Sequence, residues 1–231
     1  GRGRSRRRRR DERARQDRGS LPLSAELEDL ALPTFSDAEL AAAHDGPSVA
    51  PLLAGLDEAA RAAAVEAGRA SLAERGYLED GAPVEDLAAV VRLRTTARVV
   101  AIADVLEGSE QRSVYLYGSE PSVLEETVDG TDHAFTLRTV EGAARGLSDA
   151  ADPRGRAGDD GPLHLGAAPP PELEEELKTA ETVLRLYVVV RSGEDEVQEF
   201  SISVASGPFG VWFLSGHADP ATGEQEIWAR R

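Results

Sequence analysis

Histidine is the side chain best suited to proton transfer or metal binding near neutral pH, and this chain contains four. They are His44, His133, His164 and His217. None lies in an i, i+4 pair with another histidine, and none stands beside acids at the spacing of a metal site. We therefore predict that each is a plain surface or turn histidine, and that they form no metal centre.

The other motifs for catalysis or cofactor binding are also missing. The chain has no cysteine, which excludes disulfides, zinc fingers, iron–sulfur clusters and thiol catalysis. Its single lysine, Lys178, belongs to no phosphate-binding loop, and no serine stands in a G-x-S-x-G elbow. Acids such as Glu174, Glu175 and Glu176 suit a helix start, where they oppose the helix dipole. The sequence thus predicts a protein that is not an enzyme and binds no cofactor or metal.

Charge is distributed unevenly along the chain. Residues 1–18 hold ten arginines against three acids, whereas the other 213 residues carry −23, from 16 basic and 39 acidic side chains. Residues 1–20 lack apolar periodicity and are predicted to be a disordered Arg-rich tail, either a contact for nucleic acid or anionic lipid or a solvated tail. The acidic remainder repels phosphate backbones, so we expect neutral or basic protein partners for the folded part and no nucleic acid.

Residues 21–152 are predicted to form an α+β half. Capping residues and apolar spacing indicate helices first, and a β-branched run at 98–106 then changes the period to that of strands. Asp129-Gly130 is the strongest hairpin signal in the sequence. The expected helices are 24–31, 36–44, 57–75, 83–95 and 139–151, and the expected antiparallel strands are 98–106, 113–117, 122–128 and 133–138.

The segment SLAERGYLEDG, residues 71–81, ends the longest predicted helix. Winged-helix DNA binders end a recognition helix in a similar way, so the segment has two interpretations. With Arg75 as C-cap, Gly76 takes the C′ position, where glycine adopts the left-handed conformation without a Cβ penalty. Tyr77 and Leu72 then form the contact that accompanies a Schellman motif. The acidic turn that follows lacks the basic residues of a phosphate-reading wing, which favours a plain helix end.

The second half has a similar order of elements. A Pro/Gly-rich stretch at 153–171 is predicted to be a linker, and residues 172–231 to be a helix followed by an antiparallel β-meander. In VQEFSISV, alternation places Phe200 on one face with Ile202 and Val204. The predicted fold class is α+β, with antiparallel sheet and helices on one face. The two halves form either a pseudo-repeat or one continuous sheet.

The segment SGPFGVWFLSG, residues 206–216, is the most unusual apolar stretch. Gly210 inside it indicates a bulge or a close backbone approach. Tryptophan is a favoured anchor of protein interfaces, and Trp212 and Trp228 are the only two in the chain. We therefore take Phe209, Trp212 and Trp228 as candidate partner-binding residues. The alternative is that both tryptophans belong to the core of a sheet covered on two faces.

The order of these segments resembles one known family. An Ala-rich helix ending ASLAERGYLEDG is followed by PVEDLAAVVRLRTTARVVAIADV, then RSVYLYG, then an Asp-Gly hairpin leading into FTLRTVEGAARGL. This series resembles the EspG family, the cytosolic chaperones of type VII (ESX) secretion in actinobacteria. The similarity covers residues 56–152 and, less closely, 180–231. It implies a non-enzymatic protein that binds helical PE/PPE-type secretion clients, and it transfers no binding residue.

Two functions remain open on this basis. The first is a cytoplasmic, chaperone-like protein that binds a protein partner, and the absence of any membrane-length apolar run or secretory signal agrees with it. The abundance of arginine, alanine and glycine with one lysine also indicates a GC-rich genome. The second is a winged-helix transcriptional regulator in which residues 56–106 read DNA and the C-terminal half binds a ligand or a second copy.

Overall fold

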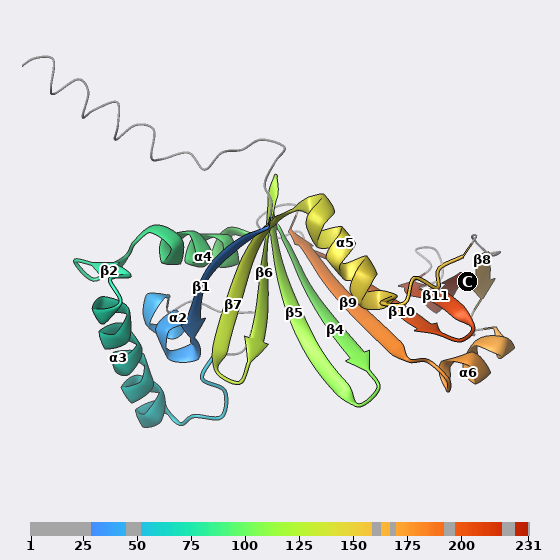
Figure 1. Ribbon diagram of the computed structural model, residues 1–231, viewed down its shortest axis with the longest axis horizontal. Coiled ribbons are helices and arrows are strands. Elements are labelled where there is room, and N and C mark those ends of the chain that lie inside the picture. Colours follow the sequence, from blue (N-terminus) through green and yellow to red (C-terminus); the bar gives the residue numbers. More distant parts are fainter. Residues whose placement is uncertain are drawn as a thin grey trace, which may run out of the picture.

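The computed structural model describes residues 29–44, 52–158, 163–166, 170–191, 197–218 and 225–230. The expected Arg-rich tail lies outside these residues. The main element of the described part is one antiparallel sheet of ten strands (Figure 1). In chain order they are β1 (Leu30–Ser36), β4 (Val99–Glu107), β5 (Glu110–Ser119), β6 (Ser122–Asp129), β7 (Asp132–Thr139), β8 (Leu163–Gly166), β9 (Thr182–Arg191), β10 (Val197–Gly207), β11 (Gly210–Ala218) and β12 (Gln225–Arg230).

The strands of the two halves share this sheet. Their order is β1-β7-β6-β5-β4-β9-β10-β11-β12-β8, and β4 pairs with β9 along its whole length, from Val99↔Val190 to Glu107↔Thr182. The predicted α+β class with an antiparallel sheet is confirmed. The pseudo-repeat is not confirmed, since the described strands form one continuous sheet. Within the segment expected to be a linker, Leu163–Gly166 forms the edge strand β8.

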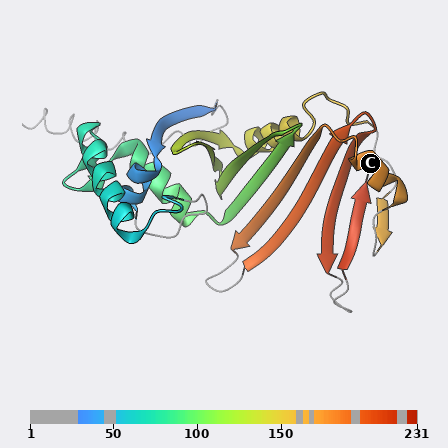
Figure 2. The same ribbon diagram turned by 90° about the horizontal axis from the view of Figure 1, so that it is seen from below.

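Five helices accompany the sheet in the described residues. They are α2 (Asp37–Ala43), α3 (Glu58–Glu74), α4 (Glu85–Thr96), α5 (Val140–Ala151) and α6 (Pro171–Leu177). A small ribbon of β2 (Leu78–Glu79) and β3 (Ala82–Pro83) connects α3 to α4. Figures 1 and 2 show α2, α3 and α4 gathered at one end of the molecule, with the strands of the second half extending toward the other end.

The helices cover both faces of the sheet rather than one. Val100 belongs to the core beneath α2, α3 and α4, whereas its neighbour Ala101 packs toward α5. Because consecutive strand residues point to opposite faces, α4 and α5 lie on opposite sides. The same alternation separates Val211, which packs with α5, from Trp212, which packs with α6. Figure 1 shows α5 and α6 on opposite sides of β9 and β10.

The end of α3 is the predicted Schellman motif. Gly76 has φ of +77°, its N–H donates to Ala73 O at 3.1 Å, and the N–H of Tyr77 donates to Leu72 O at 2.8 Å. Leu72 is fully buried and Tyr77 packs against the same core. The helix end is therefore confirmed in every contact that the motif requires. The capping box of α2, formed by Ser36 and Glu39, is also present.

Two local predictions are wrong. Leu30 and Ala31, expected at the end of a helix, belong to β1, because Leu30 and Leu32 pair with Leu137 and Phe135 of β7. The rest of that expected helix, residues 24–28, lies outside the described part. Gly210 was expected to mark a bulge or a close backbone approach; the bulge is absent, since the β10–β11 register runs evenly to the Gly207↔Gly210 pair, and the nearest atom to a Cβ placed there, Arg156 O, lies at an ordinary contact distance of 3.8 Å. Gly210 instead closes the hairpin with φ of +102°.

Candidate functional site

His133 is the histidine whose predicted surface position is wrong. It is fully buried on β7, with Nδ1 2.5 Å from Glu126 Oε1 and Nε2 2.7 Å from Asp37 Oδ1. A carboxylate only accepts hydrogen bonds, so these two contacts favour the imidazolium form of the ring, which donates from both nitrogens. Burial alone would lower the pKa of His133, but the hydrogen bonds to Glu126 and Asp37 outweigh it and raise that pKa above its usual value.

The second carboxylate oxygen of Glu126 holds two further side chains in this network. The hydroxyl of Tyr117 donates to Glu126 Oε2 at 2.7 Å, and Arg94 Nε of α4 lies 3.2 Å from the same oxygen. Burial first, and then the charge of Glu126, raises the pKa of Tyr117 far above its usual value. Asp37 in turn accepts the N–H of Leu53 at 3.3 Å. With both nitrogens of His133 engaged, no ring atom is left to act as a base, so the network joins α2 and α4 to the sheet.

This network makes stability depend on pH. Because the folded-state pKa of His133 is raised, its contribution is complete below the unfolded-state pKa of about 6.5 and disappears as the pH rises through the folded-state pKa. We expect the free energy of unfolding, from urea titrations above pH 6.5, to fall by at most about 1.4 kcal/mol per pH unit. His133→Gln should be less stable at pH 6 and lose this slope. An equal slope in both proteins would contradict the assignment.

A second feature is an exposed apolar surface on the face that carries α5. Phe200 is 45% exposed, Phe213 53% and Trp228 41%. Phe213 pairs with Val204, which packs against α5, and Trp228 shares the face of Arg230, the partner of Phe213 on β12. We call this surface, on strands β9 to β12, the α5 shelf. Its residues are Leu186, Val188, Phe200, Ile202, Phe213 and Trp228.

A cavity of about 430 Å³ lies between α5 and the α5 shelf. Leu147 and Ala151 of α5 form one wall, and Leu186, Ile202 and Phe213 of the shelf form the floor. Cavity and shelf therefore share residues and make one continuous apolar surface. At the C-terminal end of α5, Asp149 and Asp152 line the same cavity. Exposed aromatic side chains next to a concave apolar surface are typical of a protein-binding site.

The structure separates the three residues that the sequence indicated for partner binding. Trp212 is only 4% exposed, packs with Leu173 of α6, and donates from Nε1 to Glu176 Oε2 at 2.5 Å. Phe209 lies in the β10–β11 turn and packs against the same small core. Trp228 alone lies on the α5 shelf. Trp212 therefore lies on the face of the sheet that α6 covers, and Trp228 lies on the face that carries α5.

Sequence reasoning missed Phe200 and Phe213 as surface residues. The strand alternation placed Phe200 with Ile202 and Val204, which is the observed face. The pattern did not say whether that face is core or surface, because it does not reveal that α5 covers only part of it. The sequence did contain one relevant signal, the length of α5. A helix of twelve residues is short compared with the width of the sheet and can cover only a few strands.

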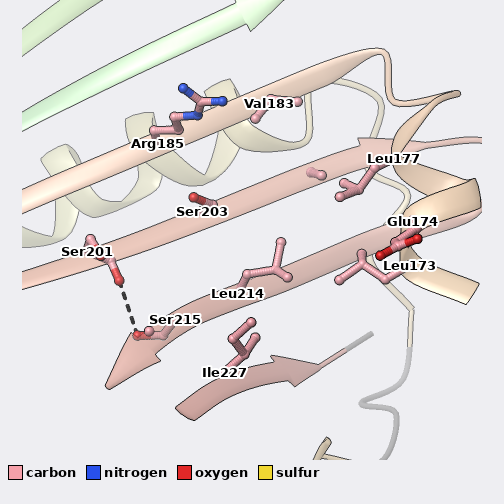
Figure 3. Close-up of a pocket in the computed structure, with 12 residues that line it drawn as sticks. Leu173, Glu174, Leu177, Val183, Arg185, Ser201, Ser203, Leu214, Ser215 and Ile227 are labelled. Carbon is pink, nitrogen blue, oxygen red and sulfur yellow. Dashed lines mark hydrogen bonds between the residues drawn. The ribbon is translucent and has the colours of Figure 1, made fainter. Parts of the chain in front are cut away.

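The α6 face has a smaller groove of about 380 Å³ (Figure 3). Leu173 and Leu177 of α6 meet Leu214 and Ile227 of the sheet there, and Ser201 and Ser203 lie along its open side. In Figure 3 the Ser215 hydroxyl donates to Ser201 O at 3.2 Å. The shelf is the stronger candidate for an apolar partner, because it adds the exposed aromatic side chains of Phe200, Phe213 and Trp228 to its cavity.

The described residues place no three histidine or acidic side chains where they could hold a metal ion. Among them, no helix is long and apolar enough to span a membrane.

The overall arrangement is similar to that of a type VII secretion chaperone. No family model and no curated protein matches the sequence. Among solved structures, the fold is similar to Mycobacterium tuberculosis EspG5, determined in complex with the PE25–PPE41 dimer. The TM-score is 0.55 and the identity 15%, over 87% of this chain and 90% of that one. This likeness concerns the fold, and none of these comparisons supports a winged-helix regulator.

Proposed function

We propose that this protein is a cytoplasmic, non-enzymatic chaperone that binds an amphipathic helix of a secretion client on the α5 shelf. The observation that carries the proposal is the exposed group of Phe200, Phe213 and Trp228 beside the cavity under α5. The fold likeness to a chaperone solved with a PE–PPE dimer supports it. The clients we propose are helical proteins of the PE/PPE type.

The shape of the shelf favours a helix as the bound element. On this face α5 packs against the sheet through Ala143, Leu147 and Ala151, and it leaves Phe200 of β10, Phe213 of β11 and Trp228 of β12 exposed. A second helix laid beside α5 would extend the same layer, contacting α5 on one side and the shelf below. An apolar stripe at i, i+3, i+4 and i+7 matches this kind of groove. Of the three residues indicated by the sequence, we propose that Trp228 contacts the client.

Binding is tested with a purified PE–PPE dimer encoded in the same genome, titrated by calorimetry. The double variant Phe213→Ser, Trp228→Ser should bind about 30-fold more weakly or worse, because aromatic anchors dominate such interfaces. The matched control is Tyr187→Ser, since Tyr187 is also 41% exposed but lies on the opposite face. The proposal fails if no such dimer binds, or if Tyr187→Ser weakens binding while the double variant does not.

A further inference from the structure

The groove on the α6 face, which we call the α6 groove, has a polar end and an apolar end (Figure 3). Arg185 of β9 and Ser203 of β10 are direct register partners, so their side chains lie next to each other on this face. Ser203 pairs in turn with Leu214 of β11, where the apolar part begins. Leu173 and Leu177 of α6 lie across the groove from Arg185. A cationic side chain thus stands at one end of a surface made largely of leucines.

The guanidinium of Arg185 is available to a ligand. Arg185 is exposed, and it forms no salt bridge with any residue that the structure describes. Its register partner on β4, Asp104, accepts the hydroxyl of Ser113 at 2.5 Å. Glu174 is the only acid among the described residues that line the groove, and it comes from α6 at the other end. Because a guanidinium carries five N–H donors in a planar fork, this end of the groove suits an oxyanion such as a carboxylate.

The apolar end is open to solvent and small. Leu177 is 38% exposed, whereas Leu173 beside it is 1% exposed and forms part of the wall. Val183 and Ile227 add further apolar side chains to the lining. The volume of about 380 Å³ lies near the lower end of the range for small-molecule sites, about 300–1,000 Å³. Such sites combine apolar walls with a few polar groups that fix the orientation of the ligand. Size and lining therefore suit one short hydrocarbon chain.

We infer that the α6 groove binds a small amphiphile, a single-chain carboxylate of about eight carbons. Its carboxylate accepts N–H bonds from Arg185, and the hydroxyl of Ser203 is a further donor. Its chain lies across Leu214 toward the leucines of α6, where burial of its CH₂ groups supplies the rest of the affinity. This site lies on the face opposite the α5 shelf, so the amphiphile and the proposed client do not compete for one surface.

NMR titrations of the isotope-labelled whole protein with hexanoate, octanoate and octanol test this inference. Octanoate should bind about tenfold more tightly than hexanoate, because it buries two more CH₂ groups. It should also bind about tenfold more tightly than octanol, which has the same chain without the charge. The two tryptophans report which face is occupied. The indole N–H signal of Trp212, which packs with Leu173 and Leu214, should shift, and that of Trp228 on the shelf should not.

Arg185→Gln should bind octanoate about tenfold more weakly and octanol as before. The matched control is Arg112→Gln, which should bind octanoate like the unaltered protein. Arg112 is also exposed but lies on the opposite face, since its partner Val105 packs toward α5. Equal affinities for octanoate and octanol overturn the contact with Arg185, as does unchanged octanoate binding by Arg185→Gln. Absence of octanoate binding, or a shift of Trp228 in place of Trp212, overturns the site itself.

Discussion

Replacing Glu126 by alanine should destabilise the protein by about 3–5 kcal/mol, the cost of removing one partner from a buried ion pair. Glu126 is fully buried and faces the imidazolium of His133, the guanidinium of Arg94 and the hydroxyl of Tyr117. The substitution leaves two buried cations with less counter-charge and one hydroxyl without an acceptor. Since the whole stability of a domain is about 5–15 kcal/mol, this loss is a large part of it.

Urea denaturation followed by circular dichroism measures this effect. Glu110→Ala is the control, because Glu110 is an exposed acid at the start of β5 and its loss should change stability by no more than about 0.5 kcal/mol. A loss below about 1 kcal/mol for Glu126→Ala would mean that the network is worth no more than a surface contact.

Replacing Gly68 by alanine should lower stability by about 1–3 kcal/mol, although alanine is the better helix former. A Cβ at Gly68 would lie 2.1 Å from the carbonyl oxygen of Ala38 and 2.7 Å from the N–H nitrogen of Glu39. These are backbone atoms of α2, so they cannot move aside as a flexible side chain would. Helices α2 and α3 would have to separate, which also strains the ion pair of Arg75 with Glu39.

Gly146→Ala in α5 is the matched control for Gly68→Ala. A Cβ there meets no atom within 4 Å, so this substitution should stabilise the protein by up to about 1 kcal/mol. The same chemical change is therefore expected to have opposite signs in two helices. Thermal unfolding of both variants checks this, and a stabilised Gly68→Ala variant would show that α2 and α3 do not approach as closely as described.

Features that depend on neighbours in the sequence could be predicted, and features that depend on distant partners could not. The Schellman motif at Gly76 and the hairpin at Asp129-Gly130 are local, and both are present. Strand β1 was missed because its conformation comes from pairing with β7, far along the chain. His133 was missed for the same reason, since Asp37 lies on a helix near the other end of the described N-terminal half.

The candidate site was predictable only in part. Strand alternation correctly separated Trp212 from Phe213, because side chains on a strand have a period of two. Which of the two faces stays open is decided by where α5 and α6 pack, and no spacing within 206–216 contains that information. Trp212 therefore looked as available as Trp228, although α6 covers it.

The pairing of β4 with β9 also has a consequence for how the chain folds. Strands β4 to β7 follow one another closely in the sequence, as do β9 to β11, so each group can assemble from contacts that are close in sequence. The pairing of β4 with β9 joins the two groups and must close the long stretch of chain between them, so the entropy of that closure falls on this strand pair. During synthesis the first group can be complete before β9 leaves the ribosome. The edge of β4 would then stay unpaired until β9 adds to it. The α5 shelf, which lies on β9 to β12, can form only after these strands have been added.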